Sequence, residues 1–125
     1  MERKMRAIIK RPDEQYGYVT NVSTSLQNLQ RIVGGHIEVV PLPFLGEGVV
    51  LICNEEGKLQ DLTPSQYIAE LHDAVCGEFL VIGSKGEELD DLQLDFDQWK
   101  AAVDAWDAEF YLWGNLEELI REEGG

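Results

Sequence analysis

The sequence predicts an α+β fold, in which a small mixed or antiparallel sheet carries short helices and an amphipathic C-terminal helix packs on it. The chain has 125 residues, of which 44% are hydrophobic, and this suits one core. Short apolar segments separated by turn residues fill the first two thirds, whereas the last third carries an aromatic stripe with helical period. We expect a single domain over residues 1–125, with a core at 5–83 and an acidic, tryptophan-rich helical extension at 87–125.

Two strands open the chain, and a short helix follows them. Residues 5–10 (MRAIIK) and 18–22 (YVTNV) flank the turn-rich segment RPDEQYG, which is the pattern of a β-hairpin. Thr24 lies three residues before Gln27, the spacing of a capping box, so a helix is expected over residues 25–33.

The middle of the chain predicts three more strands and one more helix. Residues 36–42 and 47–54 read as two strands joined by a loop rich in proline and glycine. Thr63 followed by a proline is a helix start, so a helix is expected near residues 64–74. The continuous apolar run within residues 77–83 predicts a central strand that is covered on both faces.

An aromatic stripe at helical spacing marks the C-terminal third. Asp95 is a good N-cap residue, Gly114 is expected to end the helix, and Asn115 is expected to begin a second, short helix. The stripe is about 27 Å long at 1.5 Å per residue, longer than a small sheet covers. We therefore expect core packing for most of it, with the remainder free for a partner or for self-association. The residues assigned to packing or self-association are Phe96, Trp99, Trp106, Phe110 and Trp113.

The net charge of −14 is concentrated in the second half of the chain. Residues 1–62 hold seven basic and eight acidic residues, whereas residues 63–125 hold three basic and sixteen acidic ones. An acidic field of this kind disfavours direct binding of nucleic acid. Acids fixed on or beside a helix would form an array that matches the basic surface of a host protein, although a solvated face is the simpler interpretation. The candidate partner-binding residues are Asp90, Asp91, Asp97, Asp104 and Asp107.

Membrane insertion, metal binding and catalysis find little support in the sequence. No apolar run is long enough to cross a bilayer. Cys53 and Cys76 lie in apolar stretches without metal-ligand spacing, as expected of buried thiols in the cytoplasm. His36 and His72 lack partners at metal spacing, and the serines occur in caps or turns. We therefore predict no metal, no cofactor and no catalytic residues.

Two polar segments are candidates for binding a small, nucleotide-like ligand. A double glycine can expose backbone N–H groups to a ligand, but it can equally end a helix. The asparagine that closes the strand at 47–54 can line a binding rim, but it can equally open a turn that Gly57 completes with a positive φ. The candidate ligand-binding residues are Gly34, Gly35, His36, Asn54 and Glu55.

The stretch LQNLQRIVGGHIEVVPL, followed by GVVLICNEEGKLQDL, resembles the bacterial and phage family called domain of unknown function 3846. A helix ending in a double glycine, a strand of the IEVV type and a NEEGKL-like turn occur in the order of that family. The resemblance covers roughly residues 5–83 and excludes the extension from about Glu87. It implies a phage, plasmid or other mobile element as the context, and it implies no activity.

These observations favour a protein that works by binding and is not an enzyme. The leading hypothesis is a counter-defence or host-takeover protein of a phage or mobile element, whose acidic C-terminal helical surface binds a basic host protein. The first alternative is a protein that sequesters a nucleotide-like signal, either alone or as a homo-oligomer. The second alternative is an enzyme whose signature the sequence does not reveal.

Overall fold

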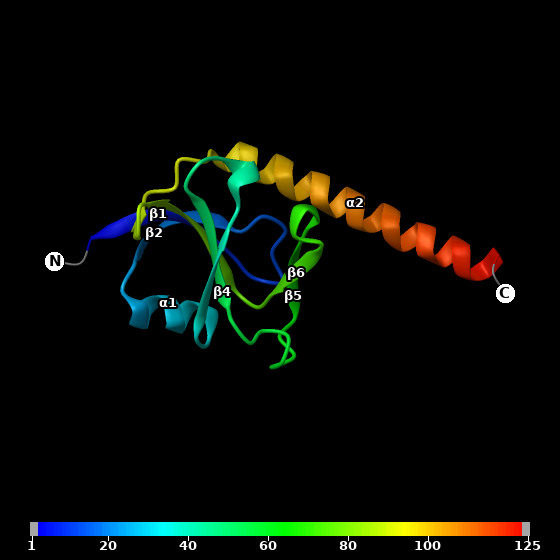
Figure 1. Ribbon diagram of the computed structural model, residues 1–125, viewed down its shortest axis with the longest axis horizontal. Coiled ribbons are helices and arrows are strands. Elements are labelled where there is room, and N and C mark those ends of the chain that lie inside the picture. Colours follow the sequence, from blue (N-terminus) through cyan, green and yellow to red (C-terminus); the bar gives the residue numbers. More distant parts are fainter. Residues whose placement is uncertain (1–2, 124–125) are drawn as a thin grey trace.

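The computed structural model describes residues 3–123 of the chain, and the side chains of residues 3–112. It confirms the α+β class (Figure 1). Every strand pair is antiparallel, and the main sheet has the order β2-β1-β7-β4-β3, with β8 paired to β7. Its strands are β1 (Lys4–Lys10), β2 (Tyr18–Ser23), β3 (Ile37–Pro41), β4 (Val49–Asn54), β7 (Phe79–Lys85) and β8 (Glu88–Asp90).

The strands predicted from the sequence are present in the main sheet. The first two form the expected hairpin, in which Ile8 pairs with Val19, and β3 pairs with β4 across the Pro/Gly loop. That loop contains the short 3-10 helix η1 (Pro43–Leu45). Strand β7 lies between β1 and β4 and its first five residues are buried, as its continuous apolar run predicts.

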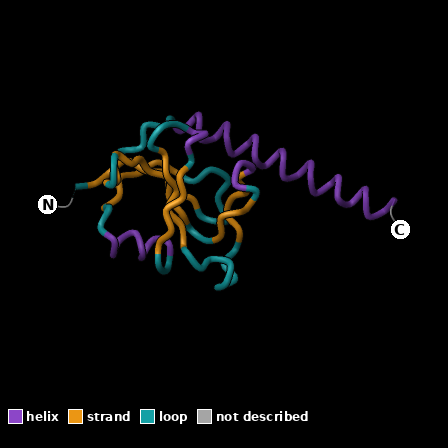
Figure 2. Tube along the Cα trace, in the orientation of Figure 1, coloured by secondary structure: helices purple, strands orange, loops and turns teal. Residues whose placement is uncertain are grey.

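The two faces of the sheet carry separate hydrophobic clusters. Helix α1 (Leu26–Val33) covers one face through Leu29 and Val33, which are both 2% exposed. The other face is covered by the C-terminal helix and by a second, two-stranded sheet, and Figure 2 shows this layered arrangement. Because side chains alternate along each strand, neighbouring residues of β1 such as Ala7 and Ile8 belong to opposite clusters.

Helix α1 begins at Leu26, one residue later than predicted, and its N-cap is also one residue later. Ser25 is the N-cap, because its hydroxyl accepts a hydrogen bond from the backbone N–H of Asn28 at 3.2 Å. The capping box predicted for Thr24 and Gln27 is therefore wrong. Gly34 ends the helix in the left-handed conformation (φ 77°), as expected of a residue without a β-carbon.

The helix predicted near residues 64–74 is wrong. This segment forms strand β5 (Pro64–Ile68), the 3-10 turn η2 (Ala69–Leu71) and strand β6 (Asp73–Cys76), which pair as a hairpin. Pro64 begins a strand instead of a helix. The apolar spacing is too short to distinguish the two structures, and packing of the hairpin against the C-terminal helix decides between them.

Helix α2 (Phe96–Glu123) begins as predicted but ends later. The backbone N–H of Asp95 donates to Gln98 Oε1 at 3.1 Å, which is the reciprocal bond of a capping box. The helix continues through Gly114, so the predicted break and the separate helix from Asn115 are wrong. A glycine inside a helix costs about 1 kcal/mol, which is too little to interrupt a long helix. Within the described residues, no helix is both long and apolar enough to cross a membrane.

The first three turns of α2 anchor it to the sheet. Trp99 and Val103 are fully buried and Trp106 is 4% exposed, which confirms the core part of the aromatic stripe. The Trp99 ring packs edge-on against Phe79 at 6.3 Å and against Trp106 at 5.7 Å between centroids. Phe96 is half-buried at the start of the stripe.

We expect Trp106→Ala to lower the free energy of unfolding by about 3–5 kcal/mol, because it leaves a cavity in the core of a small domain. Chemical denaturation followed by far-ultraviolet circular dichroism measures this. Phe110→Ala on the same helix serves as the control, because Phe110 is 60% exposed, and it should cost far less. An unchanged melting temperature for Trp106→Ala would contradict the packing.

A buried lysine is the least expected feature of the core. Lys10, the last residue of β1, is 2% exposed, and its Nζ donates to the backbone carbonyl of Ser65 on β5. Desolvation lowers the pKa of Lys10 below its usual 10.5, and the charges of Asp107 and Glu14 oppose this shift. Lys10 thus fastens the second sheet to the first.

Because the pKa of Lys10 is lower in the folded state than in the unfolded chain, the unfolded state binds more protons as the pH approaches 10.5 from below. The contribution of Lys10 to stability should therefore rise with pH in that window. Comparison with Lys10→Met isolates this contribution. In urea denaturation, we expect the wild type to gain stability relative to Lys10→Met between about pH 8 and pH 10. A difference in unfolding free energy that stays constant over this range would contradict the lowered pKa of Lys10.

Candidate functional site

Helix α2 consists of an anchored half and a projecting half. Figure 1 shows the helix crossing the domain and then continuing well beyond it. The exposed fraction changes along the helix, from 4% at Trp106 to 60% at Phe110, 72% at Tyr111 and 70% at Leu112. Phe110 contacts the body through a tilted ring pair with Tyr67, whose centroids lie 5.2 Å apart. The side chain of Trp113 lies outside the described residues.

Three predicted partner-binding acids lie on the anchored half. Asp97 has 93% of its side chain exposed and an ion pair with Lys100 at 3.5 Å. Asp104 accepts a hydrogen bond from the Tyr16 hydroxyl at 2.6 Å, and Asp107 accepts one from Gln66 Nε2 at 3.0 Å. All three are exposed, but Asp104 and Asp107 also attach the helix to the body.

The other two predicted acids form a separate set near the start of β1. Asp91 accepts a hydrogen bond from the backbone N–H of Arg6 at 2.8 Å, and Asp90 lies 3.8 Å from the guanidinium of Arg3. Both carboxylates are half-buried and engaged within the fold. The structure therefore does not unite the five aspartates in one array.

Asn54 connects the end of α1 with the end of β4. Its amide nitrogen donates to the carbonyl oxygen of Val33 and to Gln60 Oε1, both at 3.2 Å, and its Oδ1 accepts from the Glu56 N–H at 2.8 Å. A β-carbon on Gly35 would lie 2.8 Å from Asn54 Nδ2. Glycine is thus required here for close packing.

The turn after Asn54 differs from the predicted one. Gly57 does not adopt a positive φ, which is found instead at Asp61 (φ 53°). A β-carbon on Gly57 would lie 3.1 Å from the Cys76 carbonyl oxygen, so Gly57 allows the turn to approach β6. This close approach forms one end of a cavity.

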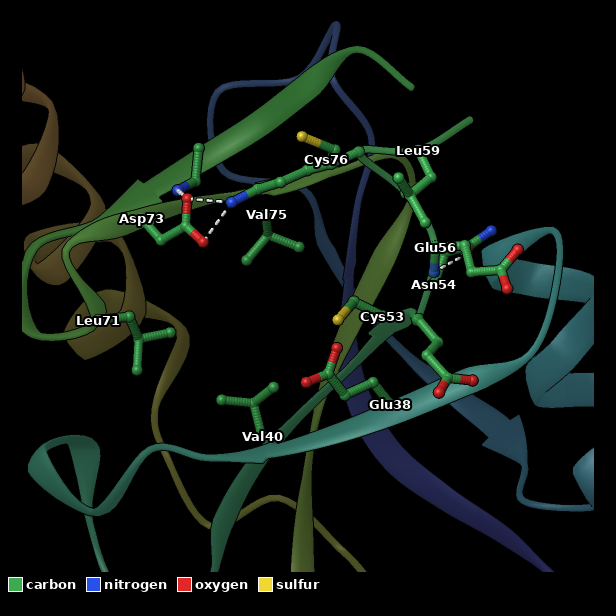
Figure 3. Close-up of a pocket in the computed structure, with 14 residues that line it drawn as sticks. Glu38, Val40, Cys53, Asn54, Glu56, Leu59, Leu71, Asp73, Val75 and Cys76 are labelled. Carbon is green, nitrogen blue, oxygen red and sulfur yellow. Dashed lines mark hydrogen bonds and ion pairs between the residues drawn. The ribbon is translucent and has the colours of Figure 1, made fainter. Parts of the chain in front are cut away.

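The cavity lies between β3–β4 of the main sheet and the β5–β6 hairpin (Figure 3). Its volume is about 360 Å³. Of the five predicted ligand-binding residues, Asn54 and Glu55 line it, whereas Gly34, Gly35 and His36 do not. The main lining residues that sequence reasoning missed are Glu38, Val40, Cys53, Lys58, Leu71, Asp73, Val75 and Cys76.

Charge is distributed unevenly around the cavity. Lys58 bridges to the carboxylate of Asp73, and this contact lowers the pKa of Asp73 and raises that of Lys58. Burial, with the nearby Glu38 charge, raises the pKa of Cys53 to about 11. Cys76 is half-buried. Across the described part of the chain, no three histidine, cysteine or carboxylate side chains are grouped to hold a metal ion.

The family model described as a domain of unknown function (DUF3846) matches residues 5–107. The chain belongs to this family. The match is longer than the predicted 5–83 and includes the anchored half of α2, so the expectation that DUF3846 excludes the region from Glu87 is wrong. The matched region includes Trp99 and Trp106, which are buried against one face of the sheet in this chain. Comparisons with curated proteins and with solved structures give no match.

We expect Cys53 in the folded protein to react slowly with iodoacetamide at pH 8, because a pKa of about 11 leaves roughly one thiol in a thousand ionised. Mass spectrometry of the Cys76→Ser variant measures the rate at Cys53 alone. The same variant in denaturant is the reference. Equal rates in the folded and the denatured protein would contradict the burial of this thiol.

Proposed function

We propose that the protein is a non-enzymatic binding protein and that α2 is its binding element. The observation that carries this proposal is the projecting half of α2, on which Phe110, Tyr111 and Leu112 are 60–72% exposed. Consecutive exposed apolar side chains on a protruding helix are costly in water and are typical of an interaction site. The buried tryptophans hold this helix in a fixed direction.

The partner that fits this surface is a protein with a basic rim around an apolar groove. From Glu109 to Glu123 the sequence holds five acidic residues and one arginine. Acidic residues beside exposed aromatics would steer a basic partner, while the apolar side chains would supply the buried contact area. A host protein that binds nucleic acid has such a basic surface, so counter-defence or host takeover by a phage or mobile element is the role we propose.

The alternative of a nucleotide-like ligand receives no support from the residues around Asn54. Four acidic residues and one lysine line the adjoining cavity, and their net negative charge disfavours a phosphate. Sequestration of a nucleotide-like signal stays a prediction from the sequence.

Capture from bacterial lysate tests the proposed function. Immobilised protein should retain a basic protein at about 50 mM salt and release most of it at about 500 mM, because screening weakens the charge attraction. The variant Tyr111→Ser/Leu112→Ser should lose the captured protein, and Glu109→Lys should slow its association. Both changes are at exposed positions and should alter stability by about 0.5 kcal/mol or less.

Asp97→Asn is the matched control, because Asp97 is exposed on the same helix but lies in the anchored half. It removes one charge and should leave capture unchanged. Capture that survives Tyr111→Ser/Leu112→Ser, or that Asp97→Asn weakens equally, would contradict a role for the projecting half.

A further inference from the structure

We infer that the cavity between β3–β4 and the β5–β6 hairpin is a binding site for a compact molecule that joins an amine or guanidinium head group to a short apolar body. This inference goes beyond the proposed function, because no residue of α2 lines the cavity. A volume of about 360 Å³ lies at the lower end of the range for small-molecule sites.

The walls of the cavity separate into an apolar floor and a charged rim. Val40, Leu71 and Val75 supply the floor. The acidic residues Glu38, Glu55, Glu56 and Asp73 line the rim. Four negative charges against the single positive charge of Lys58 favour a cation. The apolar floor adds a preference for a molecule that has a hydrocarbon part, which a hydrated inorganic ion lacks.

A buried thiol also lines the cavity. Cys53 is 8% exposed, its thiol lines the cavity in Figure 3, and no hydrogen-bond partner for its sulfur is found among the described residues. Glu38 is its direct partner across the β3–β4 pair. A buried thiol behaves as a small apolar group with a weak S–H donor, so Cys53 extends the apolar floor of the cavity, and Glu38 beside it carries the charge of the rim.

The chain itself places an ammonium group at the rim. Lys58 reaches from the turn after β4 to the carboxylate of Asp73 on β6. This contact joins exposed side chains, so its net contribution to stability is small, and a ligand can replace it at little cost. A ligand cation near Asp73 would compete with Lys58. The removal of Lys58 should therefore strengthen binding, whereas a purely structural ion pair would have the opposite effect.

Isothermal titration calorimetry of the full chain with agmatine tests the inference, because agmatine carries a guanidinium, an ammonium and a short hydrocarbon chain. Saturable binding is expected, and bound agmatine should slow alkylation of Cys53 in the Cys76→Ser variant. Pentanol as a neutral probe and glutarate as an anionic probe should bind at least tenfold more weakly. Equal or tighter binding of either probe, or no binding of agmatine, would overturn the inference.

Variants of the rim distinguish the cavity from general attraction to an acidic protein. Glu38→Gln and Asp73→Asn should each weaken agmatine binding about tenfold, which corresponds to the loss of one ion pair in a partly enclosed site. Lys58→Ala should strengthen it several-fold. Glu87→Gln removes the same charge from an exposed position outside the cavity and should have no effect. Equal weakening by Glu87→Gln, or weaker binding after Lys58→Ala, would assign the binding to net charge or to another site.

Discussion

The docking of Trp99 and Trp106 on one face of the sheet is the interaction on which the rest of the structure depends. Without α2, this face would expose the side chains of Leu51, Phe79 and Val81, which are fully buried in the folded chain. The sheet would then have a covered face under α1 and an open apolar face, an arrangement that a monomeric domain does not tolerate in water. The helix is thus part of the core as well as a projecting element, and the family match to residue 107 agrees with this.

Polar groups fix the direction of α2 after the tryptophans have fixed its position. The indole N–H of Trp99 donates to the Tyr16 carbonyl at 2.8 Å, and that of Trp106 donates to Glu70 at 2.7 Å. These acceptors lie on different elements, so the two bonds together prevent the helix from rotating about its own axis. Asp104 and Asp107 add bonds from the exposed side. The acidic residues nearest to the body therefore orient the helix, whereas Glu109 farther along is exposed.

The sequence predicted those parts of the fold that local patterns specify. Each of three local patterns fits one kind of element only. The alternation in β1 and β2 and the apolar run of β7 fit strands, and the spacing of Trp99 and Trp106 fits a helix. The helix predicted near residues 64–74 is wrong, because a few apolar positions fit either a helix turn or a short hairpin and contacts with α2 decide between them. The same error concealed the cavity, since Asp73 and Val75 line it opposite Glu38 and Cys53 only when that segment is a hairpin. No sequence pattern marks Lys10 as buried, because its environment is built from distant residues.

The β5–β6 hairpin connects the two surfaces for which binding is proposed. Leu71 and Asp73 form one wall of the cavity, while Gln66 and Glu70 hydrogen-bond to α2. The hairpin pairs with no strand of the main sheet, so its position depends on these side-chain contacts and on the bond from Lys10 to Ser65. A ligand that moved the hairpin would therefore act on the bonds that orient α2, and a partner on α2 would act on the cavity in return. Such coupling is reciprocal by thermodynamic necessity, so it would link the small-molecule site to the protein-binding helix in both directions.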